Sequence, residues 1–167
     1  MGFTCAVCGE YHEELLLDIR MGLPEPVFEL SQQERAARAD FADDAGFLCE
    51  PDGSVRFFVR GLLQIPIPEL DRHFAYGTWV EVEREDYERL GELWSDPAGE
   101  GREFRCSLAN ELEPYRGTVG LAGVLRLRSV DLLPAVELER SNHSLAAEQV
   151  SGIRRERAEA LASALPH

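Results

Sequence analysis

The sequence predicts an α+β fold, in which a mostly antiparallel sheet with flanking helices follows an N-terminal turn that resembles a zinc knuckle. Short apolar segments, several of them alternating with polar residues, recur along the chain between Gly- and Pro-containing turns, as strands of antiparallel sheets do. Segments with helical spacing lie before, between and after these strands, which favours the α+β class. Two cysteines separated by two residues stand close to the start of the chain. Together these observations define the predicted architecture.

In the N-terminal half, turn-forming residues separate one predicted helix from four predicted strands. The stretch 13–18 is a short apolar element whose type stays open, and the proline-containing stretch 22–26 breaks the chain after it. Ser31 and Glu34 have the capping-box spacing, which predicts a polar surface helix over 32–41. The predicted strands cover 47–49, 55–60, 62–68 and 76–82, with a turn at 51–54.

The C-terminal half continues the same pattern. Aromatic and leucine residues at helical spacing predict a helix over 84–94, and a loop rich in glycine follows at 95–101. Three further strands are predicted, at 104–108, 124–130 and 134–139, followed by a last helix over about 145–165 that Gly152 interrupts. All of these elements fit one domain, 1–167, with the knuckle at 3–14.

Composition and charge narrow the classes of function. The net charge of −14 and the lack of a dense basic cluster argue against nucleic acid and anionic membranes as partners. No apolar run reaches the roughly 18 residues of a membrane span, and we expect a cytoplasmic location. In the cytosol, the four cysteines indicate free thiols or metal ligands. The acidity favours solubility or a basic protein partner.

The cysteine pair predicts a zinc site. Cys5 and Cys8 have the spacing that lets two thiolates bind one ion at about 2.3 Å, and His12 is close enough to supply a third ligand. Cys49 is the candidate fourth ligand. The alternatives are reduced thiols, a facultative disulfide, or a small core residue at Cys49. Four protein ligands indicate a structural site, whereas an open fourth position would bind water and bring Glu10, Glu13 and Glu14 in as nearby bases.

Polar residues form a second constellation where the last strand meets the last helix. Ser144 is the predicted helix cap, with His143 beside it. One hypothesis is a site in which His143 exchanges protons beside a carboxylate. The alternative, which we favour, is an architectural joint that ties the helix start to the sheet by hydrogen bonds. The carboxylates and amide concerned are Glu137, Glu139, Glu148 and Gln149.

Arg60 is the third residue of interest, because it stands in an otherwise apolar strand directly before Gly61. A pair with Glu137 or Glu139 across the sheet is the commoner arrangement for such a residue. Binding of an anionic ligand is the alternative.

Several phrases of the sequence together resemble an uncharacterised bacterial family, domain of unknown function 2199. The resemblance covers nearly the whole chain and implies one compact domain, with no activity attached. The sequence departs from the family pattern at Ser144, where the family tends to have proline, and at Arg105-Cys106, where it tends to have Gly-Trp. The matching phrases are Cys5-x-x-Cys8-Gly9-x-x-His12, Cys49, Phe57-Phe58-Val-Arg60-Gly61, Ile65-Pro66, Gly77-Thr-Trp79-Val80 and Glu137-Leu-Glu139-x-x-x-His143-x-Leu145-Ala146-x-Glu148-Gln149-x-x-Gly152-Ile153.

Two functional hypotheses follow from these observations. The leading one is a non-enzymatic protein with a structural zinc knuckle that acts by protein–protein interaction, including the case of an immunity-type protein that blocks a basic toxin. The competing one is a small hydrolase that uses His143 with Glu139 or Glu148, or an open zinc ion.

Overall fold

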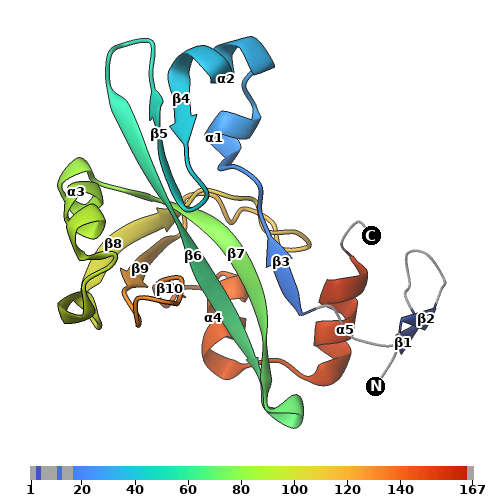
Figure 1. Ribbon diagram of the computed structural model, residues 1–167. Coiled ribbons are helices and arrows are strands. Elements are labelled where there is room, and N and C mark those ends of the chain that lie inside the picture. The colour runs from blue at the N-terminus through green and yellow to red at the C-terminus, as the bar shows by residue number, and fades with distance from the viewer. Residues whose placement is uncertain (1–2, 5–10, 13–16, 165–167) are drawn as a thin grey trace.

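The computed structural model describes residues 3–4, 11–12 and 17–164 of the chain, and its ribbon is drawn in Figure 1. The strands are β1 (Phe3–Thr4), β2 (Tyr11–His12), β3 (Asp18–Arg20), β4 (Ala39–Phe41), β5 (Ala45–Cys49), β6 (Val55–Ile67), β7 (Arg72–Val82), β8 (Glu103–Leu108), β9 (Ala122–Arg126) and β10 (Ala135–Leu138). The helices are α1 (Glu25–Phe28), α2 (Gln32–Arg38), α3 (Arg84–Leu93), α4 (Ser144–Ser151) and α5 (Arg155–Ser163), with 3-10 turns η1 (Pro68–Leu70) and η2 (Pro97–Gly99).

Two long strands, β6 and β7, form the central ribbon of the molecule (Figure 1). They pair antiparallel from Phe57 opposite Val82 to Ile67 opposite Arg72. The turn between them contains η1 and then Asp71, whose φ of 49° lies in the left-handed region. Most of the central residues of both strands are buried, because other elements cover the ribbon on both faces.

The ribbon closes into a small mixed barrel. On one side β7 pairs with β8, which is followed by β9 and β10 in antiparallel order. β10 then pairs with β6 in parallel, with Ala135 opposite Leu62, so that the five strands β6 to β10 form a closed ring. β3, β4 and β5 extend the sheet beyond this ring, and β1 and β2 form a separate antiparallel pair.

Each strand of the ribbon changes its outer partner midway. β6 pairs with β5 as far as Val59 and with β10 at Leu62, and Gly61 stands between the two. A Cβ atom on Gly61 would lie 2.5 Å from Val136 Cγ2, so the crossing strands leave room only for glycine. β7 pairs with β3 over 75–77 and with β8 from Val80.

The helices complete two groups of buried apolar side chains. α3 and α5 lie on opposite sides of the β6–β7 ribbon in Figure 1, and α4 contacts β6 and β10. Leu145 of α4 and Leu161 of α5 are fully buried in the larger group, together with Phe74 and Tyr76 of β7. A smaller group surrounds Trp79 and is formed by side chains from α1, β5 and β6. No helix in the described part of the chain is long and apolar enough to span a membrane.

The structure confirms the α+β class and corrects several details. Most strand pairs are antiparallel, as predicted, but β3–β7 and β6–β10 are parallel, so the sheet is mixed. The strands predicted at 55–60 and 62–68 are the single strand β6, because the backbone stays extended through Gly61. The end of the helix predicted over 32–41 is strand β4, which pairs with β5. The strand predicted over 124–130 is the shorter β9.

The structure adds one helix that the sequence did not predict and confirms the predicted interruption of the last one. α1 was not predicted, because Pro24 and Pro26 were interpreted as breaks; here Pro24 is the N-cap residue and Pro26 lies in the first turn, where proline is tolerated. The last helix is interrupted at Gly152, as predicted, with φ of 76°, and consists of α4 and α5.

Candidate functional site

The predicted zinc ligands are only partly described by the structure. Cys5 and Cys8 lie outside the described residues, and for His12 the backbone alone is described, in β2. Cys49 is the last residue of β5 and is exposed, and Figure 1 shows β2 and the β5–β6 turn at opposite ends of the view. Within residues 17–164 no three His, Cys, Asp or Glu side chains gather in a metal-binding arrangement. The zinc site stays a prediction.

His143 caps α4. Its Nδ1 accepts a hydrogen bond from the Leu145 N–H at 3.1 Å, and its Nε2 lies 2.6 Å from the Arg116 carbonyl oxygen. This pair of partners assigns the proton to Nε2, which donates to Arg116. The cap predicted at Ser144 is therefore wrong by one residue, since the imidazole itself reaches the free N–H of the first turn.

Two of the carboxylates that the sequence grouped with His143 have other partners. Glu148 accepts hydrogen bonds from the Tyr115 hydroxyl and from Arg157 Nε, the latter at 3.1 Å. Burial and the bond to Glu148 raise the pKa of Tyr115. Glu137 pairs with Arg126 at 2.5 Å, and Glu139 is exposed at the end of β10. The structure thus distributes these groups over several ion pairs and hydrogen bonds.

Gln149 ties α4 to the edge of β10. Its Oε1 accepts from the Leu138 N–H and its Nε2 donates to the Val136 carbonyl oxygen, both at 2.8 Å. The amide side chain therefore hydrogen-bonds to β10 as a neighbouring strand would. With the His143 cap, this contact matches the architectural alternative for the joint.

Arg60 does not pair with Glu137 or Glu139. Its side chain is buried and donates to the Met21 carbonyl oxygen at 2.6 Å and to the Asp43 carbonyl oxygen at 3.0 Å. The guanidinium carbon lies 4.6 Å from the centroid of the Trp79 ring, which is opposite Arg60 in the β6–β7 register. Burial and the nearby Arg20 lower the pKa of Arg60. Arg60 thus fixes the chain after β3 to the ribbon.

A groove lies beside β3, and it is one of several hollows on the surface of the described chain. It has a volume of about 660 Å³, and Tyr76 of β7 contributes to its lining. The Tyr76 hydroxyl donates to the Glu113 carbonyl oxygen at 2.9 Å, and burial raises the pKa of Tyr76. The lining residues come from three segments: Asp18, Ile19, Arg20, Met21, Gly22 and Leu23; Glu25 and Phe28; and Glu111 and Glu113.

Asn110 fixes two of these segments to β7. It is fully buried, and its Oδ1 accepts from the Trp79 backbone N–H at 2.7 Å, where β7 has changed partner from β3 to β8. Its Nδ2 donates to the Leu23 carbonyl oxygen at 2.8 Å. One amide therefore holds the turn after β3 and the stretch 111–113 in fixed relation.

Two carboxylates of the groove are held by backbone groups. Glu25 Oε1 accepts from the Glu111 N–H at 3.1 Å, and Glu111 Oε1 accepts from the Thr118 N–H at 3.2 Å. The Thr118 hydroxyl accepts from the Leu112 N–H and donates to the Asn110 carbonyl oxygen. This network presets the shape of the groove.

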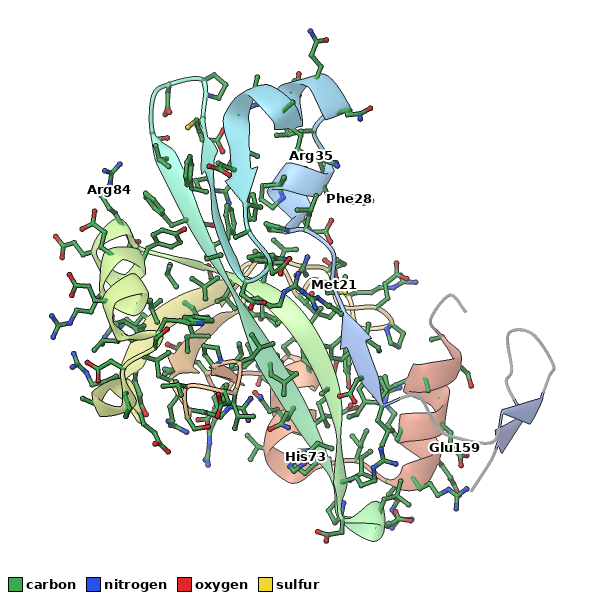
Figure 2. The ribbon with its side chains drawn as sticks, viewed as in Figure 1. Met21, Phe28, Arg35, His73, Arg84 and Glu159 are labelled. Atoms are coloured by element: carbon green, nitrogen blue, oxygen red, sulfur yellow. The ribbon has the colours of Figure 1, made fainter. Side chains whose placement is uncertain are left out.

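The groove combines negative charge with exposed apolar surface. Four of its lining residues are acidic, namely Asp18, Glu25, Glu111 and Glu113, whereas Arg20 is the one cation that lines it in the described chain. Phe28 of α1 is 66% exposed. Figure 2 shows Phe28 and Met21 near the edge of the sheet that β3 forms. Such a surface suits an apolar side chain flanked by positive charges.

Sequence reasoning did not identify this groove. Its carboxylates come from segments that are separated along the chain, and in the sequence they are apparent only as part of the net charge. Asn110 carries no periodic or motif signal. The isolated acidic pair at 111 and 113 and the apolar Phe28 were visible, but only the fold brings them together.

Comparisons with known proteins place the chain among proteins without an assigned activity. The family model described as "Uncharacterized protein conserved in bacteria (DUF2199)" matches residues 4–153. No curated protein matches the chain, and no solved structure does so either.

Proposed function

The chain belongs to the DUF2199 family of uncharacterised bacterial proteins, and on this premise we propose that it acts as a non-enzymatic cytosolic protein that binds a basic segment of a protein partner. The observation that carries the proposal is the groove beside β3, which combines four carboxylates with the exposed Phe28. The net charge of −14 adds long-range attraction for a basic partner.

The composition of the groove supports a protein segment as its occupant. Aromatic residues at the centre of an interface often carry much of the binding energy, and Phe28 is available for this role. Carboxylates around such an anchor steer a cationic partner and reject an anionic one. Because Asn110, Glu25 and Glu111 fix the walls by hydrogen bonds, little ordering is needed on binding.

The alternative hydrolase hypothesis relies on His143 with Glu139 or Glu148, or on an open zinc ion. The geometry gives it less support, because both ring nitrogens of His143 have backbone partners and Glu148 is bound by Tyr115 and Arg157. A general base needs a ring nitrogen that reaches the substrate. The His143 side chain would have to break its hydrogen bond with Leu145 or Arg116 to free a ring nitrogen for the substrate.

Zinc is part of the same proposal. Cys5, Cys8, His12 and Cys49 would hold one ion in a closed tetrahedral site, and a closed site has a structural role. The support is the spacing of the cysteine pair and the following histidine.

A binding measurement with a defined probe tests the proposed interaction. The probe is a fluorescein-labelled peptide of four Arg-Val repeats, and fluorescence anisotropy at low salt follows its binding. We expect saturable binding with a Kd of about 1–100 µM that weakens as salt screens the charges. A peptide of four Glu-Val repeats should not bind.

Two double variants with an equal change in charge locate the site. Asp18→Arg with Glu113→Arg alters exposed carboxylates of the groove and should weaken binding at least about tenfold. Glu85→Arg with Glu88→Arg alters exposed residues of α3 and should leave the Kd within about twofold. Equal losses in both variants, or no binding by the unaltered protein, would reject the groove as the binding site.

A further inference from the structure

β3 forms one end of the eight-stranded sheet. It pairs in parallel with β7, with Asp18 opposite Ala75 and Arg20 opposite Gly77. Among the residues that the structure describes, no strand pairs with the other edge of β3. The groove follows this edge, since every residue of β3 lines it.

The hydrogen bonds to β7 show which backbone groups of β3 face away from it. The Ala75 N–H donates to the Leu17 carbonyl oxygen at 2.7 Å, and the Met21 N–H donates to the Gly77 carbonyl oxygen at 2.8 Å. In a parallel pair, residues alternate between the two edges of a strand. The N–H and C=O groups of Asp18 and Arg20 therefore face outward, beside the groove.

We propose that the partner binds as an added β-strand on the outer edge of β3, with its basic side chains against the carboxylates of the groove. This inference rests on the function proposed above and specifies how the same site is used. An extended segment that pairs with Asp18 and Arg20 gains backbone hydrogen bonds, while its side chains meet the groove.

Charge decides what kind of strand occupies this edge. Asp18, Glu25 and Glu113 lie along the groove and attract a basic segment. A second copy of this chain carries a net charge of −14 and would be repelled. The occupant is therefore an extended basic segment of another protein.

The edge is held in place before binding. The chain directly after β3 is fixed by Arg60, which donates to the Met21 carbonyl oxygen, and by Asn110, which donates to the Leu23 carbonyl oxygen. The Trp79 indole N–H donates to the Gly22 carbonyl oxygen at 3.3 Å. A strand that is already extended and anchored pairs with little further loss of entropy.

Backbone methylation of the probe tests strand addition directly. Two versions of the Arg-Val peptide carry N-methyl groups, one on every arginine and the other on every valine. Alternate N–H groups of a strand face opposite edges, so only one version can still donate hydrogen bonds towards β3. We expect the two versions to differ at least about tenfold in Kd.

A pair of protein variants gives a second measurement. Arg20→Pro removes the outward N–H, and proline is compatible with an edge strand. Arg20→Ala removes the same side chain but keeps the N–H. The expected result is that Arg20→Pro binds the unmethylated probe at least about fivefold more weakly than Arg20→Ala, with matching thermal unfolding.

The outcomes separate this inference from the proposed function. If the unmethylated probe binds at the groove and both methylated versions bind equally, strand addition is overturned while the binding function stands. If the unmethylated probe does not bind, both proposals fail. A dimer of the protein alone in sedimentation velocity that Arg20→Pro dissociates would assign the edge to a second copy and overturn the inference.

Discussion

Asn110 shows how one side chain can replace part of a strand. β8 ends at Leu108, and the Ala109 N–H still donates to the Trp79 carbonyl oxygen. The Asn110 amide then accepts the Trp79 N–H and donates to Leu23. The interruption between β3 and β8 on the edge of β7 is thereby bridged without an unpaired N–H at Trp79.

We predict that Asn110→Ala destabilises the protein by about 2–4 kcal/mol, because it leaves the buried Trp79 N–H and Leu23 carbonyl group without their partner. Chemical denaturation monitored by tryptophan fluorescence measures the free energy of unfolding. Asn142→Ala is the matched control, since Asn142 is exposed, and it should change stability by less than about 0.5 kcal/mol. Equal effects of the two variants would contradict the role given to Asn110.

Local chemistry explains which residues the sequence could assign. Ser31 was predicted to cap a helix, and its hydroxyl does accept the Glu34 N–H, because the partner lies three residues away. The sequence also singled out His143 and Arg60 as residues of interest. Their partners, Arg116 and Met21, are distant in the sequence and could not be found from it.

At the scale of elements, residue patterns predicted the strands from β5 onward, whereas β4 was predicted as the end of a helix and the parallel strand pairs were not predicted. The segments of β5 to β8 and β10 were found from their residues alone. The segments on either side of Gly61 were predicted as two strands, yet Gly61 allows one continuous β6 to pass close to Val136, at the point where the partner of β6 changes from β5 to β10. The parallel pairs β6–β10 and β3–β7 join segments far apart in sequence, and no local pattern encodes them.

The cap of α4 gives a prediction at this scale. His143→Ala should lower the free energy of unfolding by about 1 kcal/mol, because the Leu145 N–H loses its acceptor in the first turn. His143→Asn should recover part of this loss, since asparagine is a favourable N-cap residue. Thermal and chemical denaturation measure both variants. No loss in His143→Ala would show that the cap does not stabilise α4, and the hydrolase hypothesis for His143 would regain support.

For the whole molecule, composition predicts a basic partner, and the fold supplies the place where we propose that it binds. The excess of acidic residues argues against nucleic acid, but the same excess gives no position on the surface. The position comes from β3 at the end of the sheet and from the stretch 111–113 beside it. The fold thus brings acidic residues from separate segments together in one groove.

The zinc hypothesis also concerns the whole chain, because its ligands span residues 5 to 49. Native protein is treated with Ellman's reagent before and after a strong chelator, alongside elemental mass spectrometry for zinc. Cys106 is buried, and burial raises the pKa of its thiol to about 12, so it should react slowly in both cases. If zinc binds Cys5, Cys8, His12 and Cys49, the other thiols react quickly only after chelation, and the melting temperature falls at the same time.

Because Cys49 is exposed, its reaction rate shows whether it is a zinc ligand, and so whether the site is closed or open. If the native protein contains one zinc ion and Cys49 still reacts at once, Cys49 is not a ligand. The site then has three protein ligands and an open fourth position that can bind water. Cys5→Ser should lower the zinc content and the melting temperature together. Cys49→Ser should do the same if Cys49 is the fourth ligand, and should change neither quantity if its thiol is uninvolved. Equal melting curves with and without chelator, and no zinc in the purified protein, would exclude a structural metal. The binding proposed for the groove beside β3 would then be independent of any metal at the N-terminal cysteines.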